Sequence, residues 1–376
     1  MSTQTAERQQ AQNQVSAWNA IHPVGTRVVV AQYPGAQVTR TEAMLLFDRR
    51  PVIYLEGFHG YFDLADVRPE KATVASTKPA SETRLPMDQT LGFMFPGQGS
   101  QAVGMGEGLF DAFPELTHEA DQILGYSIRQ LCLEDPRGVM VQTEYTQPAL
   151  FVVNALSYLQ RIRTTGVRPG YVLGHSLGEY SALFAAEVFD FATGLRLVQK
   201  RGALMAEAKG GGMAAVIGMD AARVTEVLQQ AGLNTIDVAN HNTPVQTVIS
   251  GLEREVLSAQ SVFMNAGARV FIPLKVSGAF HSRYMANAQQ SLRTFMDTLP
   301  FSAPRIPVIA NVTALPHQVG AIRDLLAQQL VSPVRWVDSI RYLERQGVTT
   351  FEELGPGTVL KGMIAAIHAK APANRG

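Results

Sequence analysis

A serine flanked by glycines is the residue of this sequence with the clearest chemical context. It stands in Gly174-His-Ser176-Leu-Gly178, between a short apolar run and a segment with helical character. Small residues two positions before and two positions after a serine permit the sharp strand–turn–helix of a nucleophile elbow, which lifts the hydroxyl out of the sheet. The helix that follows aims its N–H groups at the charge that forms on attack. The pattern therefore predicts that Ser176 is a nucleophile.

A serine hydroxyl is a weak nucleophile at its ordinary pKa and needs a base. The chain has eight histidines. His175 is adjacent to the serine, and we expect its side chain to point away from the elbow. His281 stands where a compact segment returns to the larger domain, and a cleft between two subdomains is a common place for a binding site. We predict His281 as the base, with a packed or surface histidine as the alternative.

A glycine-rich segment allows a competing interpretation. Gly97-Gln-Gly-Ser-Gln-Ala102 follows a strand-like run and fits the dinucleotide pattern G-x-G-x-x-A. A Rossmann fold also needs a second strand that ends in an acidic residue about 20 positions on. Glu115, Glu119 and Asp121 stand in charged, helix-like sequence with no strand before them. We therefore favour a loop that presents a backbone N–H to an oxyanion.

Composition excludes several classes of function. Lys and Arg number 32 and so do Asp and Glu, so no positive charge excess favours binding to nucleic acid by counterion release. The single cysteine, Cys132, can form neither an intrachain disulfide nor a thiolate metal site. No stretch reaches the ~18 apolar residues that span a bilayer. We expect a cytoplasmic protein that binds no membrane.

The N-terminal part of the chain differs from the rest in composition and in hydrophobic pattern. Residues 1–17 are polar and Gln-rich, and we expect a disordered or fraying start. Residues 18–69 contain short strand-like runs, which predict a small β-rich accessory module. Residues 70–89 are rich in Ser, Thr, Pro and Ala without periodicity, which is typical of a linker.

The rest of the chain must position the chemistry. Strands alternate with helices in residues 90–212 and 279–370, which predicts an α/β fold, an α/β-hydrolase-like large subdomain around a parallel sheet. Residues 213–278 have the order β-α-β-β-α-β, which predicts an inserted ferredoxin-like small subdomain. Residues 371–376 are a tail. Arg201 follows a helical run and by itself is typical of a solvated charge.

Several motifs occur in order between residues 90 and 370, about three quarters of the chain. They are Phe95-Pro-Gly-Gln-Gly-Ser-Gln101, Tyr145-Thr-Gln-Pro-Ala-Leu150, Gly174-His-Ser-Leu-Gly-Glu-Tyr-Ser-Ala182, Lys200-Arg-Gly202, Gly278-Ala-Phe-His-Ser282, Ile309-Ala-Asn311 and Glu353-Leu-Gly-Pro-Gly357. In these motifs the chain resembles the malonyl-CoA:acyl carrier protein transacylase family. Within that family it is most similar to the free-standing, trans-acting acyltransferases that serve polyketide synthases. The family core has no counterpart to residues 1–89.

The resemblance implies roles for the catalytic residues. Ser176 would be the nucleophile and His281 the general base, and no metal or redox cofactor would be needed. Gln329 matches the position whose backbone or amide oxygen orients the imidazole in this family. The backbone N–H groups of Gln98 and Leu177 would form the oxyanion hole.

The resemblance also implies the substrates. Arg201 matches the anchor for the free carboxylate of a malonyl group, Gln147 matches a further pocket position, and Phe280 matches the bulky residue that leaves no room for an α-methyl. The expected partners are malonyl-CoA, the phosphopantetheine arm of an acyl carrier protein and a polyketide synthase assembly line. Two alternatives remain, a hydrolase that releases stalled acyl groups and a non-catalytic scaffold.

Overall fold

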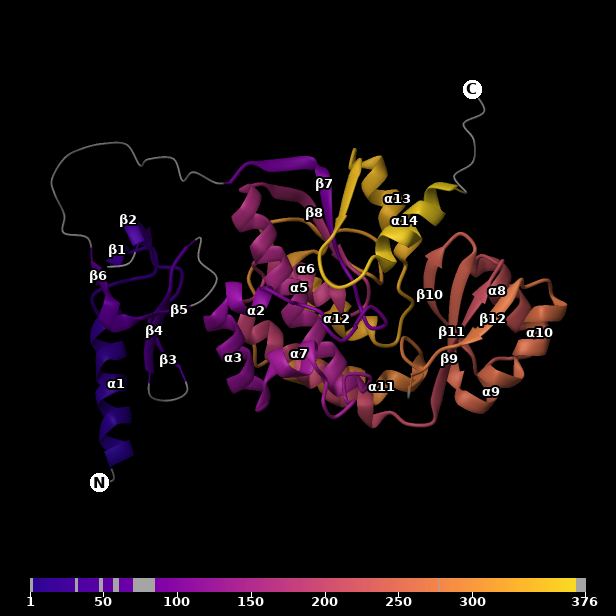
Figure 1. The fold of residues 1–376 in the computed structure, drawn as a ribbon, viewed down its shortest axis with the longest axis horizontal. Coiled ribbons are helices and arrows are strands. Elements are labelled where there is room, and N and C mark those ends of the chain that lie inside the picture. The colour runs from indigo at the N-terminus through magenta and orange to yellow at the C-terminus, as the bar shows by residue number, and fades with distance from the viewer. Residues whose placement is uncertain are drawn as a thin grey trace. The chain divides into compact units, whose positions relative to one another are not determined.

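The structure is a computed structural model that describes residues 3–30, 33–46, 50–56, 61–69, 85–276 and 278–369. The chain divides into two compact units, Met1–Arg84 and Leu85–Gly376, which are labelled along the chain in Figure 1. The expected linker lies outside the described residues from 70 to 84, and the expected tail lies wholly outside them.

The first unit combines one helix with two small antiparallel sheets. One sheet has the order β2-β1-β6 and the other has the order β3-β4-β5. The bounds are α1 (Thr3–Asn19), β1 (Arg27–Val30), β2 (Tyr33–Val38), β3 (Met44–Leu46), β4 (Arg50–Tyr54), β5 (Tyr61–Asp63), the 3-10 turn Leu64–Asp66 and β6 (Val67–Pro69).

The helix α1 shows that the expectation of a disordered start at residues 1–17 was wrong. Val15 and Trp18 belong to the hydrophobic core of the first unit, and Ala11, one turn earlier, is also buried. The Asn19 side chain exchanges two hydrogen bonds of 2.8 Å with the main chain of Ala43. Ala, Gln, Glu and Arg favour helices, and a stripe of only three apolar residues among them is easily missed.

The second unit is built on a parallel sheet, as expected. Its strand order is β13-β8-β7-β14, and every neighbouring pair runs parallel. The strands are β7 (Met87–Phe95), β8 (Arg168–Gly174), β13 (Val308–Ile309) and β14 (Thr350–Glu353). Because β7 begins at Met87, the linker expected to reach residue 89 ends earlier.

Helices cover both faces of the parallel sheet. Side chains alternate along a strand, so Phe93 and Phe95 face one core while Met94 faces the other. The first core is covered by α5 (Thr143–Thr165), α6 (Gly178–Ala185) and α7 (Phe191–Glu207), and the second by α13 (Trp336–Arg345) and α14 (Val359–Ala369). Phe95 and Gly174 are partners at the carboxyl ends of β7 and β8, so the loops that follow them meet. Ligands of such sheets bind at this edge.

A second, antiparallel sheet is inserted after α7. Its strand order is β10-β11-β9-β12. The elements are β9 (Gly211–Ile217), α8 (Ala221–Gln230), β10 (Asp237–Thr243), β11 (Gln246–Leu252), α9 (Glu253–Ser258), α10 (Gln260–Asn265) and β12 (Val270–Pro273). Figure 1 shows the three helices on one side of the sheet, where Val224 and Phe263 form part of a separate core.

Shorter helices complete the second unit. They are α2 (Leu109–Ala112), α3 (Pro114–Leu124), α4 (Ile128–Leu133), α11 (Ala286–Met296), α12 (Ile322–Gln329) and the 3-10 turns Arg283–Met285 and Val319–Ala321.

Candidate functional site

The serine elbow forms as the glycine spacing predicts. Ser176 has a φ of +51°, in the left-handed region that side chains rarely adopt. A Cβ at Gly174 would lie 1.8 Å from the carbonyl carbon of Gly178, and a Cβ at Gly178 would lie 1.9 Å from the carbonyl oxygen of Phe95. Only glycine therefore fits at either position. The turn places the Ser176 hydroxyl between the ends of β7 and β8.

Asn311, in the turn that follows the neighbouring strand β13, supports the elbow. The Ser176 N–H donates to the Asn311 side-chain oxygen at 2.7 Å, and the Asn311 amide donates to the Gly174 carbonyl at 2.7 Å. His175 points the other way, since its Nε2 lies 2.8 Å from the side-chain oxygen of Asn242. His175 is therefore not the partner of the Ser176 hydroxyl.

That partner is His281, which is buried in the second unit. Its Nε2 lies 2.7 Å from Ser176 Oγ, and its Nδ1 lies 2.7 Å from the main-chain oxygen of Gln329. A carbonyl oxygen can only accept, so Nδ1 carries the proton and Nε2 can accept the one from the serine. Burial, and secondly the charge of Arg201, lower the pKa of His281 to about 3. The imidazole is therefore neutral at pH 7.

Arg201 lies on α7 with a fully buried side chain. Its guanidinium donates to Ser176 Oγ at 3.1 Å and to the side-chain oxygens of Gln147 at 2.7 Å and Gln329 at 2.9 Å. It also lies over the Tyr180 ring, 5.2 Å from the centroid. The sequence alone favoured a solvated charge here, and the structure contradicts that. Among the described residues, no carboxylate lies within ion-pair distance of Arg201.

The glycine-rich loop lies against the elbow. A Cβ at Gly97 would be 2.3 Å from the His175 carbonyl oxygen and 3.7 Å from the Leu177 amide nitrogen. Gln98, the next residue, and Leu177 donate no backbone hydrogen bond among the described residues. The loop continues in turns until α2 begins at Leu109, so no helix starts at the glycines to bind a pyrophosphate, and the dinucleotide interpretation is wrong.

Gln147 and Phe280 have different surroundings. Gln147 is buried beside Arg201, and its side-chain amide also donates to the Met205 sulfur at 3.3 Å. Phe280 is buried in the large core of the second unit. Its ring packs against Gly278, since a Cβ added at Gly278 would lie 2.6 Å from the Phe280 ring. The structure thus brings Gln147 into the polar cluster and leaves Phe280 in apolar surroundings.

Two buried polar residues next to this cluster, Glu179 and His317, were not predicted from the sequence. Glu179 accepts from the Gln329 side-chain amide at 2.6 Å and from the Asn311 main-chain N–H at 3.1 Å, and it lies 2.7 Å from His317 Nε2. An acidic residue in the first turn of the otherwise apolar α6 was a signal that could have found Glu179. His317 follows no motif, and the sequence held no signal for it.

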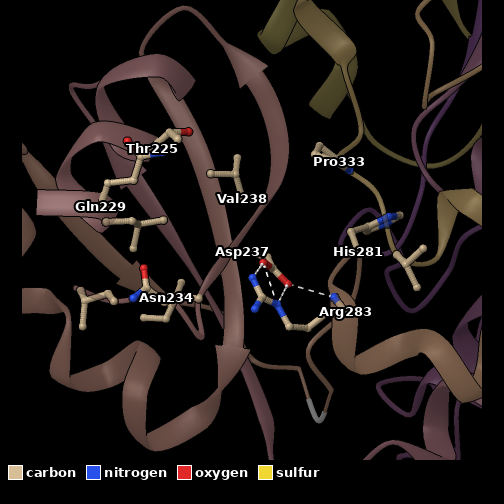
Figure 2. Close-up of a pocket in the computed structure, with 12 residues that line it drawn as sticks. Thr225, Gln229, Asn234, Asp237, Val238, His281, Arg283 and Pro333 are labelled. Atoms are coloured by element: carbon tan, nitrogen blue, oxygen red, sulfur yellow. Dashed lines mark hydrogen bonds and ion pairs between the residues drawn. The ribbon is translucent and has the colours of Figure 1, made fainter. Parts of the chain in front are cut away.

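A cavity of about 700 Å³ opens beside His281, between the antiparallel sheet with its helix α8 and the loops at residues 281–283 and 331–333, and Figure 2 shows its lining. The lining includes residues of α8, Asp237 and Val238 of β10, Arg283 and Pro333. Asp237 and Arg283 form an ion pair at the cavity, drawn with dashed lines in Figure 2. His281 is also among the lining residues.

Metal clusters and membrane spans are both absent from the described part of the chain. No group of three or more His, Cys, Asp or Glu side chains is arranged to hold a metal ion there. No helix within the same residues combines the length and the apolar character required to cross a bilayer.

Comparison with known proteins decides the family. Residues 92–374 match the family model of the acyl transferase domain. The chain belongs to the acyl transferase family. Within this family it is 54% identical over 283 residues to the polyketide biosynthesis malonyl CoA-acyl carrier protein transacylase BaeC of Bacillus velezensis. That match covers 75% of this chain and 98% of BaeC.

Solved acyl transferase structures share the fold. The malonyl CoA-acyl carrier protein transacylase of Burkholderia pseudomallei is 46% identical to this chain with a TM-score of 0.73. The match covers 76% of this chain and 100% of that transacylase. PlMCAT is a malonyl-transacylase that was solved in complex with AntF, its type II polyketide synthase acyl-carrier protein. It is 36% identical to this chain with a TM-score of 0.71, and the match covers 74% of this chain and 92% of PlMCAT. The family match begins at residue 92, so the first unit lies outside it.

Proposed function

We infer that this chain is a malonyl-CoA:acyl carrier protein transacylase of polyketide biosynthesis. It moves a malonyl group from malonyl-CoA to the phosphopantetheine thiol of an acyl carrier protein. Relatives that carry this name match three quarters of the chain, and BaeC is covered almost completely. A related transacylase has been solved in complex with its carrier protein, which supports the same kind of partner here.

The observation that carries the choice of acyl group is the environment of Arg201. Its guanidinium is fully buried, touches the serine hydroxyl and has amide oxygens but no carboxylate as partners among the described residues. A buried cation without an anion is costly, and the carboxylate of a malonyl group would offset that cost. Acetyl groups would leave it unpaired. We therefore propose Arg201 as the malonyl anchor, with Gln147 beside it.

The first half of the reaction forms an ester on Ser176. The hydroxyl oxygen attacks the thioester carbonyl of malonyl-CoA while its proton moves to His281 Nε2. The Gln98 and Leu177 amides, which have no other acceptor among the described residues, would stabilise the oxyanion, each contributing about 10²–10³ in rate. The C–S bond then breaks, and His281 returns the proton to the coenzyme A sulfur.

The second half of the reaction reverses these steps with another thiol. His281 takes the proton of the phosphopantetheine thiol, and the sulfur attacks the malonyl ester. The C–O bond breaks, the proton returns to Ser176 Oγ, and the malonyl carrier protein leaves. A thiolate leaves easily, so an imidazole oriented by the Gln329 carbonyl is a sufficient base without a carboxylate.

Hydrolysis and a purely structural role find less support. A hydrolase for neutral acyl chains gains nothing from a buried guanidinium beside its nucleophile, and BaeC is named as a transacylase. A scaffold has no need of a serine and a histidine 2.7 Å apart.

We also propose the finer architecture. The strand order β10-β11-β9-β12 with its β-α-β-β-α-β connectivity supports a ferredoxin-like small subdomain at residues 213–278, inserted into an α/β-hydrolase-like large one. The separate core of the first unit supports an accessory module at residues 18–69. We also propose that Phe280 disfavours acyl groups with an α-methyl, such as methylmalonyl, because its bulky ring belongs to the residue next to His281.

Intact-protein mass spectrometry tests the function directly. We expect the wild-type protein to gain the mass of one malonyl group from malonyl-CoA, and to lose it to a carrier protein bearing phosphopantetheine. Ser176→Ala should gain none. Acylation of that variant would refute the nucleophile, and release of free malonate without transfer would favour hydrolysis.

A further inference from the structure

Glu179 is a buried carboxylate to which the mechanism gives no task. It lies in the first turn of α6, directly after the elbow glycine Gly178, and its side chain is 1% exposed. Burying a carboxylate is unfavourable unless hydrogen bonds or charges compensate. Glu179 has three such partners, the His317 ring, the Gln329 side chain and the Asn311 main chain. The chain thus maintains an anion directly behind its nucleophile.

Gln329 connects this anion to the rest of the site. Its side-chain NH₂ donates to Glu179 at 2.6 Å and to the Ser176 carbonyl at 2.9 Å. Its side-chain oxygen accepts from Arg201 at 2.9 Å, and its main-chain oxygen holds His281 at 2.7 Å. One residue therefore touches the nucleophile, the base and the cation.

The amide of Gln329 has only one useful orientation. A carboxylate can accept but cannot donate, and a guanidinium can donate but cannot accept. With Glu179 on one side and Arg201 on the other, the nitrogen faces the anion and the oxygen faces the cation. If the amide turned over, NH₂ would face guanidinium and oxygen would face carboxylate. Glu179 makes that state unfavourable together with Arg201 and the Ser176 carbonyl, and it is the member of the three that takes no part in the reaction.

We propose that Glu179 is a positioning residue that acts through the side-chain amide of Gln329 to hold Arg201 in the orientation that selects a diacid acyl group. This inference rests on the proposed malonyl transfer. Its second support is His317, which lies fully buried and occupies the other carboxylate oxygen, so that Glu179 itself is held in place. When Ser176 carries an acyl group, its oxygen becomes a weaker acceptor, and Arg201 then depends on its two glutamine partners.

The test separates charge from shape. Glu179→Gln keeps the size, and its oxygen can still accept from Gln329 and Asn311. Its NH₂ would face His317 Nε2, which can become an acceptor because Nδ1, without a partner among the described atoms, can take the proton. We compare kcat/KM for self-acylation by malonyl-CoA and by acetyl-CoA, using intact-protein mass spectrometry.

The matched control is Glu353→Gln. Glu353 is another buried carboxylate of the second unit, and it accepts from the Leu360 and Lys361 N–H groups at the start of α14. We expect Glu179→Gln to lower the malonyl rate about 10-fold, because a hydrogen bond to a neutral oxygen replaces one to a charged oxygen, and to leave the acetyl rate nearly unchanged. Glu353→Gln should leave the malonyl-to-acetyl ratio as in the wild type, even if the protein melts earlier.

Several outcomes would overturn the inference. A malonyl-to-acetyl ratio of Glu179→Gln equal to that of the wild type would do so, whether the two rates are unchanged or both fall by the same factor. If Glu179→Gln does not fold, His317→Gln replaces it, with the same direction expected and an unchanged ratio decisive against the inference. A wild-type protein that takes no malonyl group would instead refute the proposed function, and this inference with it.

Discussion

At the scale of single residues, Arg201 acts on its neighbours through its charge as well as its hydrogen bonds. It is the second cause, after burial, of the lowered pKa of His281. Positive charge nearby disfavours a protonated imidazole. The same guanidinium that would hold the malonyl carboxylate therefore keeps the base ready to accept a proton.

This coupling predicts the pH dependence of self-acylation. Because the pKa of His281 is lowered from 6.5 to about 3, its imidazole is neutral over the whole range between these values, where an ordinary histidine would become protonated. We expect kcat/KM to show no fall centred near pH 6.5. Malonyl-pantetheine is the suitable donor for the pH–rate profile, since it lacks the phosphates of coenzyme A. Removing the cation in Arg201→Ala should raise the pKa and move the loss of activity to higher pH.

Arg201→Lys is the control for this prediction, because it keeps the cation but lacks the planar fork. For Arg201→Lys, the low-pH side of the pH–rate profile should stay near that of the wild type, while the rate of self-acylation by malonyl donors falls. A wild-type profile that loses half its activity near pH 6.5 would contradict the neutral, buried imidazole.

At the scale of elements, the loop that carries His281 is tied to β10 of the antiparallel sheet. The Asp237 carboxylate accepts from the Arg283 main-chain N–H at 2.9 Å and pairs with its guanidinium, as Figure 2 shows. The Tyr284 hydroxyl donates to the Thr235 carbonyl at 2.9 Å. His281 itself has a φ of +57°, a conformation that surrounding contacts must maintain.

We expect Asp237→Ala to slow self-acylation more than it destabilises the fold. The ion pair is partly exposed and contributes about 0–1 kcal/mol to stability. A small displacement of His281 nevertheless costs about 10-fold or more in rate, because proton transfer depends on geometry. Acylation rates and thermal unfolding of the same samples measure the two effects.

Asp111→Ala is the control, since it removes an exposed ion pair with Arg129 between α2 and α4, which carry no residue of the site. It should leave the rate at the wild-type level. A wild-type rate for Asp237→Ala would show that the β10 contacts do not position the loop.

At the scale of the whole molecule, the two units have separate cores, and the family match lies within the second. We therefore expect residues 85–376 alone to fold and to be acylated by malonyl-CoA at the wild-type rate. A truncation that starts at residue 90 should melt several degrees lower. It removes Met87 and Asp88, which pair with Arg168 and Pro169 at the start of the parallel sheet.

Acylation by mass spectrometry and thermal unfolding distinguish the two truncations. An insoluble or inactive 85–376 protein would show that the first unit is integral to the enzyme. Equal stability of the two truncations would show that the first residues of β7 contribute nothing.

Local patterns were enough for much of the fold. The parallel sheet, the inserted antiparallel sheet and the elbow all follow from periods and turns that a few neighbouring residues set. The helix at Thr3–Asn19 was missed because only three apolar residues lie along its buried face. The strands on which that face packs come later in the chain. The expected cytoplasmic location stays a prediction.

By itself, the sequence determined the nucleophile turn, a candidate base and the motifs of the acyl transferase resemblance, because these depend on residue type and on short spacing. The role of Arg201 came from that resemblance alone. The tertiary structure decided which of them meet. It showed that Arg201 is buried against Ser176 and that the main chain of Gln329, not its amide, faces His281. It also placed Glu179 and His317 behind the site. Most of these contacts join residues far apart in the chain, and only the packing of strands and helices brings such residues together.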